Sequence, residues 1–337
     1  MFDKQQPPSY NGEVNYIQER KQSIPQQEPV YFQHAPKGWT IVINNRFWTG
    51  GYWIFVSEDA CEKYDAFKKK KNDANVMDLQ RQGIGIPLLK IVLPLNPMSS
   101  KFMTIERFLP SSQGAFDADV NNYDYCVVKK YSHMGYNTYI FEFTPDPKAP
   151  QLNFQVFMFS HSTLPISDYI FRGERYRWID ESYADRFNTL YQVIFGFKHT
   201  MLTPDQPSLC DSWDGKHNKL DNKKSNPYLS SYFKTKLNSR SRFPKPEYYG
   251  HSCSAILGEA DSYSSRGYAE LKTADTYSGD SNKNYESTLS VNEDALVLTC
   301  IATVLKREKD IEQEKRRQQQ RRLRSGANNN FLISMGV

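Results

Sequence analysis

The chain has 337 residues, 39% of them apolar and 14% aromatic, which is enough to build a packed core without disulfides or metals. Its five cysteines are odd in number, widely spaced and never arranged as C-x-x-C, so the sequence favours neither a disulfide framework nor a zinc site and fits a reducing, cytoplasmic compartment. The net charge is +5, and because we find neither a signal-peptide-like start nor an apolar run of about 18 residues, we expect no secretion and no membrane span.

Residues 1–36 are rich in Gln and Pro, a composition that predicts a disordered tail. Within this tail Pro7, Pro8 and Tyr10 form a PPxY sequence, a polyproline segment of the kind that fits the aromatic grooves of WW domains. PPxY segments resemble those through which adaptors recruit HECT-type ubiquitin ligases, so we expect a WW-domain protein as a partner. The alternative is a chance match in a chain with many Pro and Tyr residues.

Residues 37–305 are expected to form one folded domain that is mostly β. It opens with a hairpin that turns at Asn44-Asn45 and bends at Gly50-Gly51, followed by one exposed, Lys-rich helix over Glu58–Gln82. Short runs of Tyr, Phe, Val and Ile between Gly, Pro and Asn turns then predict about a dozen strands in all, as in sandwiches or barrels. The predicted strands are Trp39–Ile43, Arg46–Val56, Leu88–Leu93, Phe102–Leu109, Tyr123–Tyr131, Tyr136–Phe143, Phe154–Phe159, Ile166–Phe171, Arg175–Ile179, Leu190–Phe197, His251–Leu257, Gly267–Thr273 and Tyr285–Val291.

The polar stretch at 202–249 is too long for an ordinary connection, and we interpret it as a surface insertion. After the last strand, Ser290 and Glu293 have the spacing of a capping box, with Asn292 as an alternative N-cap, so a helix is expected to begin here. Its next eleven residues, 295–305, carry no charge on any side, which indicates burial all round. The alternatives are a strand or a helix packed on one sheet.

The positive charge of the chain is concentrated after this apolar stretch. Between Ala295 and Ser325 there are nine basic and four acidic residues, whereas the rest of the chain holds 34 of each sign. We expect a basic helical extension over 306–324 and a flexible tail over 325–337. Its candidate ligand residues for anionic partners are Lys306, Arg307, Lys315, Arg316, Arg317, Arg321, Arg322 and Arg324. A solvated helix end, with Glu312 and Arg316 paired, is the alternative.

About a dozen antiparallel strands followed by one apolar C-terminal helix resemble the tubby C-terminal and LURP-one superfamily, in which a barrel encloses such a helix. The match covers roughly residues 38–305 and includes the hairpin sequence FRGERYRW at 171–178. The resemblance implies a single antiparallel β-barrel of about twelve strands around the C-terminal helix, and it implies phosphoinositide binding. It places no family ligand residue at a position of this chain, and the insertion and the basic extension depart from the family pattern.

A second basic candidate lies on the predicted strands, where Arg and Lys alternate with aromatic residues. A basic aromatic patch of this kind is suited to phosphate groups, although strand arginines more often pair with Asp or Glu. Its candidate residues for an anionic ligand are Arg172, Arg175, Arg177, Lys129 and Lys130.

Signals for catalysis are weak, and we predict no catalytic residue, no metal and no cofactor. The sequence around Ser252 departs from G-x-S-x-G at its last position. Asp211, Asp214, His217 and Asp221 match no established metal-ligand spacing.

These features predict a noncatalytic tubby-like protein at the cytoplasmic side of a membrane. It would associate with an anionic phospholipid such as a phosphoinositide and recruit a WW-domain HECT ligase. The alternative is a protein-interaction adaptor or nuclear regulatory protein without lipid binding, for which nucleic acid is a less favoured partner.

Overall fold

The computed structural model describes residues 39–46, 51–94, 99–180, 196–221, 226–229, 255–259, 268–273 and 285–334. The strands are β1 (Thr40–Arg46), β2 (Gly51–Phe55), β3 (Leu89–Val92), β4 (Lys101–Phe108), β5 (Asn122–Ser132), β6 (Tyr136–Phe143), β7 (Phe154–His161), β8 (Ile166–Phe171), β9 (Glu174–Asp180), β10 (Gly196–Met201), β11 (Ala255–Glu259) and β12 (Tyr268–Thr273). The α-helices are α2 (Glu58–Phe67), α3 (Ala74–Arg81) and α5 (Glu293–Ser334), and the short 3-10 helices are η3 (Lys68–Lys70), η4 (Pro150–Leu152), η7 (Leu209–Ser212) and η10 (Thr288–Ser290).

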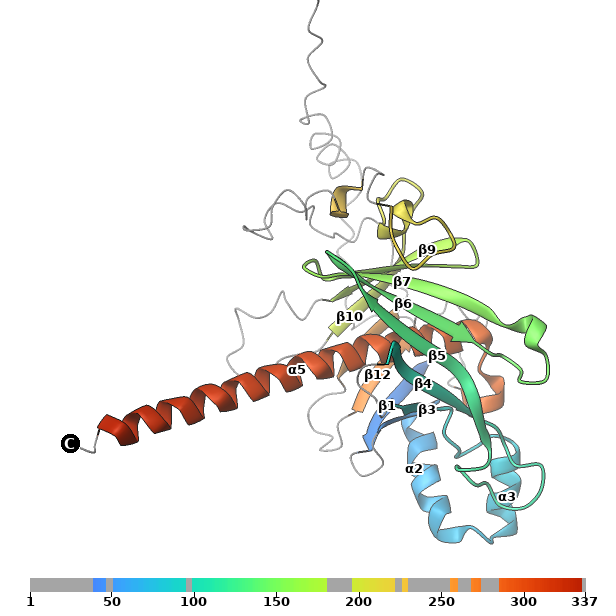
Figure 1. Cartoon of the computed structure of the whole chain (residues 1–337). Coiled ribbons are helices and arrows are strands. Elements are labelled where there is room, and N and C mark those ends of the chain that lie inside the picture. The colour runs from blue at the N-terminus through green and yellow to red at the C-terminus, as the bar shows by residue number, and fades with distance from the viewer. Residues whose placement is uncertain are drawn as a thin grey trace, which may run out of the picture.

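All strand pairs are antiparallel, and each strand pairs with its neighbours in chain order. Because β1 pairs with β12 as well as with β2, the described strands form a closed barrel (Figure 1). The prediction of a mostly β, antiparallel fold with a C-terminal helix is confirmed.

Alternation along each strand sends one side chain into the barrel and the next outward, as β pleating requires. On β6, for example, Tyr139 and Phe141 belong to the inner core, whereas Ile140 belongs to a separate outer cluster. The bend predicted at Gly50-Gly51 stays a prediction, because Gly50 lies outside the described residues and Gly51 is the first residue of β2. Glycine at position 51 has a steric reason. A Cβ at Gly51 would lie 2.2 Å from the carbonyl oxygen of Ile91, so β2 can approach β3 this closely only with glycine there.

The first part of α5 fills the barrel. Residues 295–306 are all buried, and their apolar side chains belong to the same core as inward residues of the strands. Every strand contributes to this core, through Ile41, Ile54, Ile91, Ile105, Val128, Phe141, Met158, Tyr169, Trp178, Phe197, Leu257 and Leu271. The prediction that this stretch is buried on all sides is therefore confirmed.

Local bonds explain how a helix with hydroxyl groups tolerates this environment. Asn292, the alternative N-cap, accepts a hydrogen bond from the backbone N–H of Ala295 at 2.8 Å. The hydroxyls of Thr299 and Thr303 donate to the carbonyls four residues earlier, at 2.6 and 2.7 Å. The two buried hydroxyl groups are therefore hydrogen-bonded within the helix itself.

The single helix expected over residues 58–82 is wrong, because the structure breaks it into two helices joined by the lysine run. Ser57 caps α2, and Asp73 caps α3 through a new turn. α2 packs on the outer face of the first hairpin, where Tyr64 contacts the rings of Trp53 and Phe55 at 5.5 and 5.6 Å between centroids. A second N-cap residue, here Asp73, indicates where one helix ends and the next begins, which helix propensity alone does not.

Two predicted local structures are also wrong. The expected turn at Asn44-Asn45 lies inside β1, where the two residues pair with Trp53 and Tyr52. The expected strand over residues 285–291 is a loop with η10, which hydrogen-bonds back to Gly83 before the barrel helix begins. Of the expected strand at 190–197, only the end falls in β10, and residues 190–195 lie outside the described ones.

The polar insertion is held against the barrel by a few apolar anchors. Its described parts, 202–221 and 226–229, cover the outer face of β6–β9. Leu209, Leu220 and Tyr228 are buried there in a second core. Composition predicted a surface insertion but not its anchors, because the anchoring residues are few and widely separated.

Candidate functional site

The two ends of the buried part of α5 are fixed to the barrel by charged groups. At the entry end, Arg172 in the β8–β9 turn pairs with Glu293 at 2.9 Å and with Asp294 at 3.0 Å. Both acidic residues lie in the first helical turn, where they also favour the helix dipole. Arg172 has a φ of 51°, a left-handed conformation that is unfavourable for an arginine. The two ion pairs hold the Arg172 side chain against the first turn of α5 in this conformation.

At the opposite end, α5 leaves the barrel through a ring of paired side chains that we call the exit collar. Lys130 on β5 pairs with Glu308 at 2.7 Å. Asp180 on β9 pairs with Lys309. The three barrel residues of the collar are Tyr52, Lys130 and Asp180, and the four helix residues are Lys306, Glu308, Lys309 and Asp310.

Tyr52 illustrates how the collar is arranged. Burial and the neighbouring Asp310 carboxylate raise the pKa of Tyr52 well above its usual range, so its hydroxyl stays protonated and donates to Asp310. The same carboxylate accepts a hydrogen bond from Lys306 at 3.1 Å, and the Lys306 ammonium lies over the Tyr52 ring. Lys306 and Lys309 are only 6% and 9% exposed. Lys306, which was predicted as a ligand residue for an anionic partner, therefore serves the collar instead.

The remaining acidic groups of this region are paired just beyond the collar. Glu312 accepts from Lys309 at 3.0 Å and pairs with Arg316, as predicted from their spacing. Burial alone would raise the pKa of Glu312, but these two cations outweigh it and lower the pKa below its usual value. Arg307 pairs with Glu314 at 3.4 Å. All four acidic residues of the extension are therefore neutralised close to the barrel.

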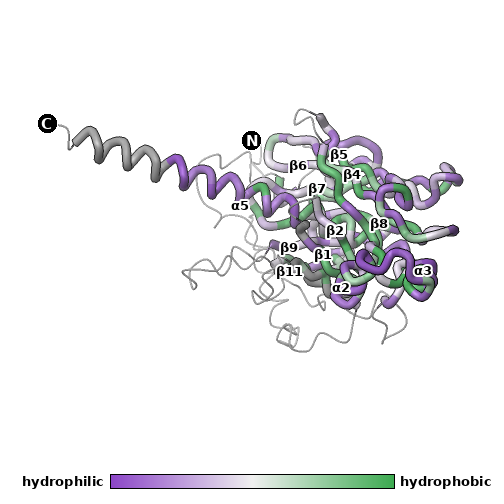
Figure 2. The backbone as a smooth tube through the Cα atoms, turned by 90° about the horizontal axis from the view of Figure 1, so that it is seen from below, coloured by the Kyte–Doolittle hydropathy of each residue, from purple (hydrophilic) through white to green (hydrophobic). Residues whose placement is uncertain are grey.

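Beyond Glu314 the helix carries only positive charge. We call Lys315–Arg322 the basic segment; it contains five basic and no acidic residues, and most of its side chains are exposed. Among the described residues, Lys315, Arg317 and Arg321 form no ion pair. Figure 2 shows this hydrophilic part of α5 projecting away from the barrel. Arg324 lies on the same helix, but its side chain is outside the described ones.

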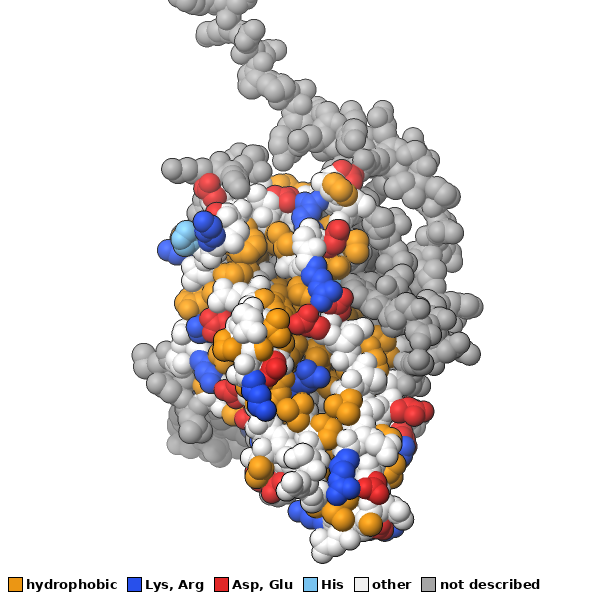
Figure 3. Space-filling model, turned by 90° about the vertical axis from the view of Figure 1, so that its right-hand side faces the viewer, with side chains coloured by type: hydrophobic (Ala, Val, Ile, Leu, Met, Phe, Trp, Pro, Cys, Tyr) orange, Lys and Arg blue, Asp and Glu red, His pale blue; other side chains and the backbone are white. Residues whose placement is uncertain are grey.

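The rest of the surface that can be followed has a different character. On the side facing the viewer in Figure 3, Lys and Arg side chains are interspersed with Asp and Glu. The exposed lysines at 69–71 follow α2, which lies below the barrel in Figure 1, whereas the end of α5 projects to the left. Within the described residues, α5 carries an exposed run of one sign, with five basic and no acidic residues over 315–322.

The five residues predicted as a patch for anionic ligands are not assembled into one. Lys129 faces outward and pairs with Glu142 at 2.7 Å, whereas Lys130 belongs to the exit collar on the inner side. Arg175 pairs with Asp211 at 2.7 Å. The two lysines on β5 are separated from the arginines on β9 by three strands, β6, β7 and β8. Each of the five has an acidic partner.

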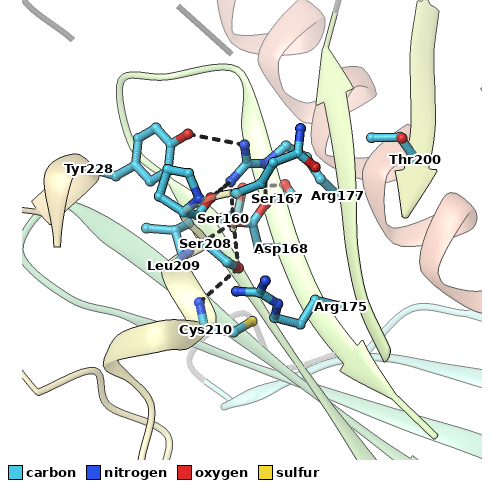
Figure 4. A network of polar contacts seen from close by, with 12 residues as sticks. Ser160, Ser167, Asp168, Arg175, Arg177, Thr200, Ser208, Leu209, Cys210 and Tyr228 are labelled. Atoms are coloured by element: carbon cyan, nitrogen blue, oxygen red, sulfur yellow. Dashed lines mark hydrogen bonds and ion pairs between the residues drawn. The ribbon is translucent and has the colours of Figure 1, made fainter. Parts of the chain in front are cut away.

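Arg177 has the most demanding environment of the five (Figure 4). It is 3% exposed and forms a bidentate pair with Asp168, with both N–O distances at 2.7 Å. Its other donors reach the Tyr228 hydroxyl at 3.1 Å and the Pro207 carbonyl at 2.9 Å. Burial opposes the charge of Arg177, but Asp168 outweighs burial and raises the pKa of the guanidinium. This network attaches the insertion to β8 and β9.

The residues considered for catalysis or metal binding hold local structure instead. Asp211 caps η7 through the N–H of Ser208. Asp214 accepts from the backbone and from the ring of His217 at 2.5 Å, which lowers the pKa of Asp214. No group of three His, Cys, Asp or Glu residues suited to a metal occurs in the part of the chain that the structure describes. Ser252 lies outside the described residues.

Sequence reasoning missed the exit collar and an aromatic cluster inside the barrel. His199 on β10 is fully buried, stacks on Tyr176 at 5.3 Å and shares a hydrogen bond of 2.8 Å with the Tyr169 hydroxyl. Burial lowers the pKa of His199 to about 3. The cluster joins β8, β9 and β10, and the collar joins β2, β5 and β9 to α5, so only the register of the strands in the barrel would have revealed them.

Comparison with known proteins identifies a family. A family model described as DIA1 matches residues 37–317, which includes the whole described barrel, the exit collar and the first cations of the basic segment. Searches of curated proteins and of solved structures found no match. None of the described helices contains a stretch long and apolar enough to cross a membrane. The PPxY residues Pro7, Pro8 and Tyr10 lie outside the described residues.

Proposed function

The chain belongs to the DIA1 family, and we propose that it is a noncatalytic adaptor that joins a WW-domain protein to an anionic partner. The WW-domain protein binds the PPxY sequence, and the anionic partner binds the basic segment of α5. We further propose a relation to the tubby C-terminal and LURP-one superfamily, which the enclosure of an apolar helix by antiparallel strands supports.

One observation carries the proposal for the anionic partner. The helix is fixed in the barrel at both ends of its buried part, yet its next turns expose Lys315, Arg317 and Arg321, three cations that form no ion pair among the described residues. A helix that is polar on all sides gains little from its own fold, so the exposed basic segment is explained best by a partner. Its rigid attachment lowers the entropy that binding must offset.

Two further observations support a binding role over catalysis. The groups that resembled catalytic or metal-binding residues form caps and turns, as described for Asp211 and Asp214. A barrel that binds a ligand holds it in its interior, and in this protein α5 occupies that interior.

The WW-domain interaction is tested by titrating a PPxY-binding WW domain into the full chain. Tyr10→Ala is expected to weaken binding at least tenfold, because the Tyr ring fills an aromatic groove. Tyr16→Ala, a change of the same kind in the same tail, is expected to alter affinity less than twofold. If the unaltered chain does not bind, or if both substitutions weaken binding equally, the adaptor proposal is wrong.

An anionic phospholipid surface is one candidate for the anionic partner of α5. It is favoured by the number of cations in the basic segment, since each Lys or Arg near an anionic membrane contributes about 1 kcal/mol. A phosphoinositide would supply the same electrostatic attraction from several negative charges on one head group. The predicted patch of Arg172, Arg175, Arg177, Lys129 and Lys130 adds nothing to it, because these residues are paired and separated.

A further inference from the structure

The cations of the basic segment surround the helix. Successive residues of an α-helix are rotated by about 100°, so Lys315, Arg316 and Arg317 span about 200° of the circumference. Arg321 and Arg322 fall in the remaining sector, and no sector wider than about 100° lacks a cation. A partner that uses all five charges, with Arg316 exchanging its partly exposed ion pair with Glu312 for the new contact, must face the helix from more than one side.

This arrangement is poorly matched to a membrane surface. A helix that lies in the lipid interface needs an apolar face, usually with Trp, Phe or Leu. From Ile311 to Arg322 the only apolar residue is Ile311 itself. A flat anionic surface would therefore be reached by the cations of one side only.

The groove of a nucleic acid duplex faces a helix from three sides. The major groove of B-DNA is about 12 Å wide and about 8.5 Å deep and admits an α-helix, with phosphates along both edges. In Figure 1 α5 projects from the barrel, and Lys315 and Arg322 lie about 8 and about 18 Å along the helix axis from Asp310, the last helix residue of the collar. The segment can thus lie along the groove, with the barrel beyond one end of it.

The side chains also suit phosphodiesters. Four of the five cations are arginines, whose planar guanidinium binds phosphate oxygens in a bidentate manner. Gln318, Gln319 and Gln320 fill the gap between the two basic clusters and supply uncharged hydrogen-bond donors. The major groove of duplex RNA is too narrow for a helix. The segment is therefore expected to prefer duplex DNA to duplex RNA.

We infer that the basic segment of α5 binds double-stranded DNA by entering the major groove and contacting phosphates on both edges. The inference rests on the proposed function, because it names the chemistry of the anionic partner of the same segment. Base contacts are not required, so binding is expected to be governed by salt rather than by sequence.

The test measures binding of the full chain to a labelled 20-base-pair DNA duplex by fluorescence anisotropy between about 50 and 200 mM salt. Three or four phosphate contacts predict a slope of log affinity against log salt of about −3 to −4. The triple variant Lys315→Gln, Arg317→Gln, Arg321→Gln is expected to bind at least tenfold more weakly at low salt, with a slope of about −1. Its melting curve should match that of the unaltered chain, since all three side chains are exposed.

The matched control is the triple variant Lys69→Gln, Lys70→Gln, Lys71→Gln, which removes the same charge from another exposed site. It should change DNA affinity less than threefold, and an equal loss in both variants would overturn the inference.

An RNA duplex of the same length should bind at least tenfold more weakly than DNA. Equal binding of the two duplexes would contradict entry of the helix into the major groove.

Vesicles containing anionic phospholipid form the last arm of the test. If vesicles bind through the same three residues and DNA does not, the inference is wrong while the proposed anionic partner stands. If neither DNA nor vesicles bind the unaltered chain, both the inference and that part of the proposed function are wrong.

Discussion

At the scale of single residues, His199 couples the stability of the barrel to pH. Its ring is enclosed by Tyr169, Tyr176 and Trp178, and burial lowers its pKa to about 3 from an ordinary value of about 6.5. Between these two pH values the unfolded chain binds a proton that the folded chain does not. The free energy of unfolding must therefore fall as the pH falls below about 6.5.

This gives a quantitative prediction for acid unfolding. His199 alone should remove about 1.4 kcal/mol of stability for each pH unit below 6. Urea unfolding of the unaltered chain and of His199→Gln at pH 7, 6 and 5 checks this, because the variant should lose less stability between pH 6 and 5. His161, whose pKa is also lowered by burial, contributes in the same direction in both proteins and cancels from the comparison. Equal losses in the two proteins would show that His199 is not enclosed.

At the scale of elements, the insertion depends on one buried ion pair. The Asp168 carboxylate accepts from Arg177, from the Ser208 hydroxyl at 3.0 Å and from the Leu209 N–H at 2.8 Å. It therefore links β8 and β9 to the segment that begins η7. Removing one member of a buried pair leaves the other charge without compensation, which costs more than the pair itself contributes.

Asp168→Asn is accordingly expected to lower the free energy of unfolding by about 3–5 kcal/mol. It should also expose residues 202–229 to proteolysis under conditions in which the unaltered insertion resists cleavage. Glu142→Gln, which disrupts the more exposed pair with Lys129, serves as control and should cost at most about 1 kcal/mol. A similar small effect for both substitutions would mean that the apolar anchors alone hold the insertion.

Helix α5 shows what sequence patterns can and cannot reveal about an element. Uniform apolarity over 295–305 was sufficient to predict burial on all sides, because no other environment suits such a helix. The basic run after it was correctly located but treated as one unit. Burial of Lys306 and Lys309 depends on partners such as Asp180. These partners lie far away in the chain, so no sequence pattern around the lysines indicates them.

For the whole molecule, the strands with alternating aromatic and β-branched residues were predicted well; β6 and β8 have the predicted bounds. The prediction was wrong where local composition competed with tertiary pairing, as at Asn44 and Asn45, which resemble turn residues but lie within β1. The paired state of the β9 arginines was likewise hidden, since Asp168 and Asp211 reach them only in the folded barrel.

Helix α5 carries charges of both signs up to Glu314 and only positive charge after it, which has a consequence for the charge of the whole molecule. The chain carries +5, and the residues after Glu314 include six basic and no acidic ones, so a chain that ends at Glu314 carries −1. We expect this shortened protein to pass through a cation-exchange column at pH 7 that retains the full chain.

The shortened protein should nevertheless keep its fold. The described side chains after Glu314 are largely exposed, and the removed ion pair between Glu312 and Arg316 is worth about 0.3–0.5 kcal/mol. Its melting temperature should therefore stay within about 4 °C of the full chain. Ending the chain at Thr303 instead removes Val304 and Leu305 from the core and Lys306 and Glu308 to Asp310 from the exit collar, and this variant should unfold. Retention of the −1 protein on the column, or its unfolding, would contradict the division of the helix at Glu314.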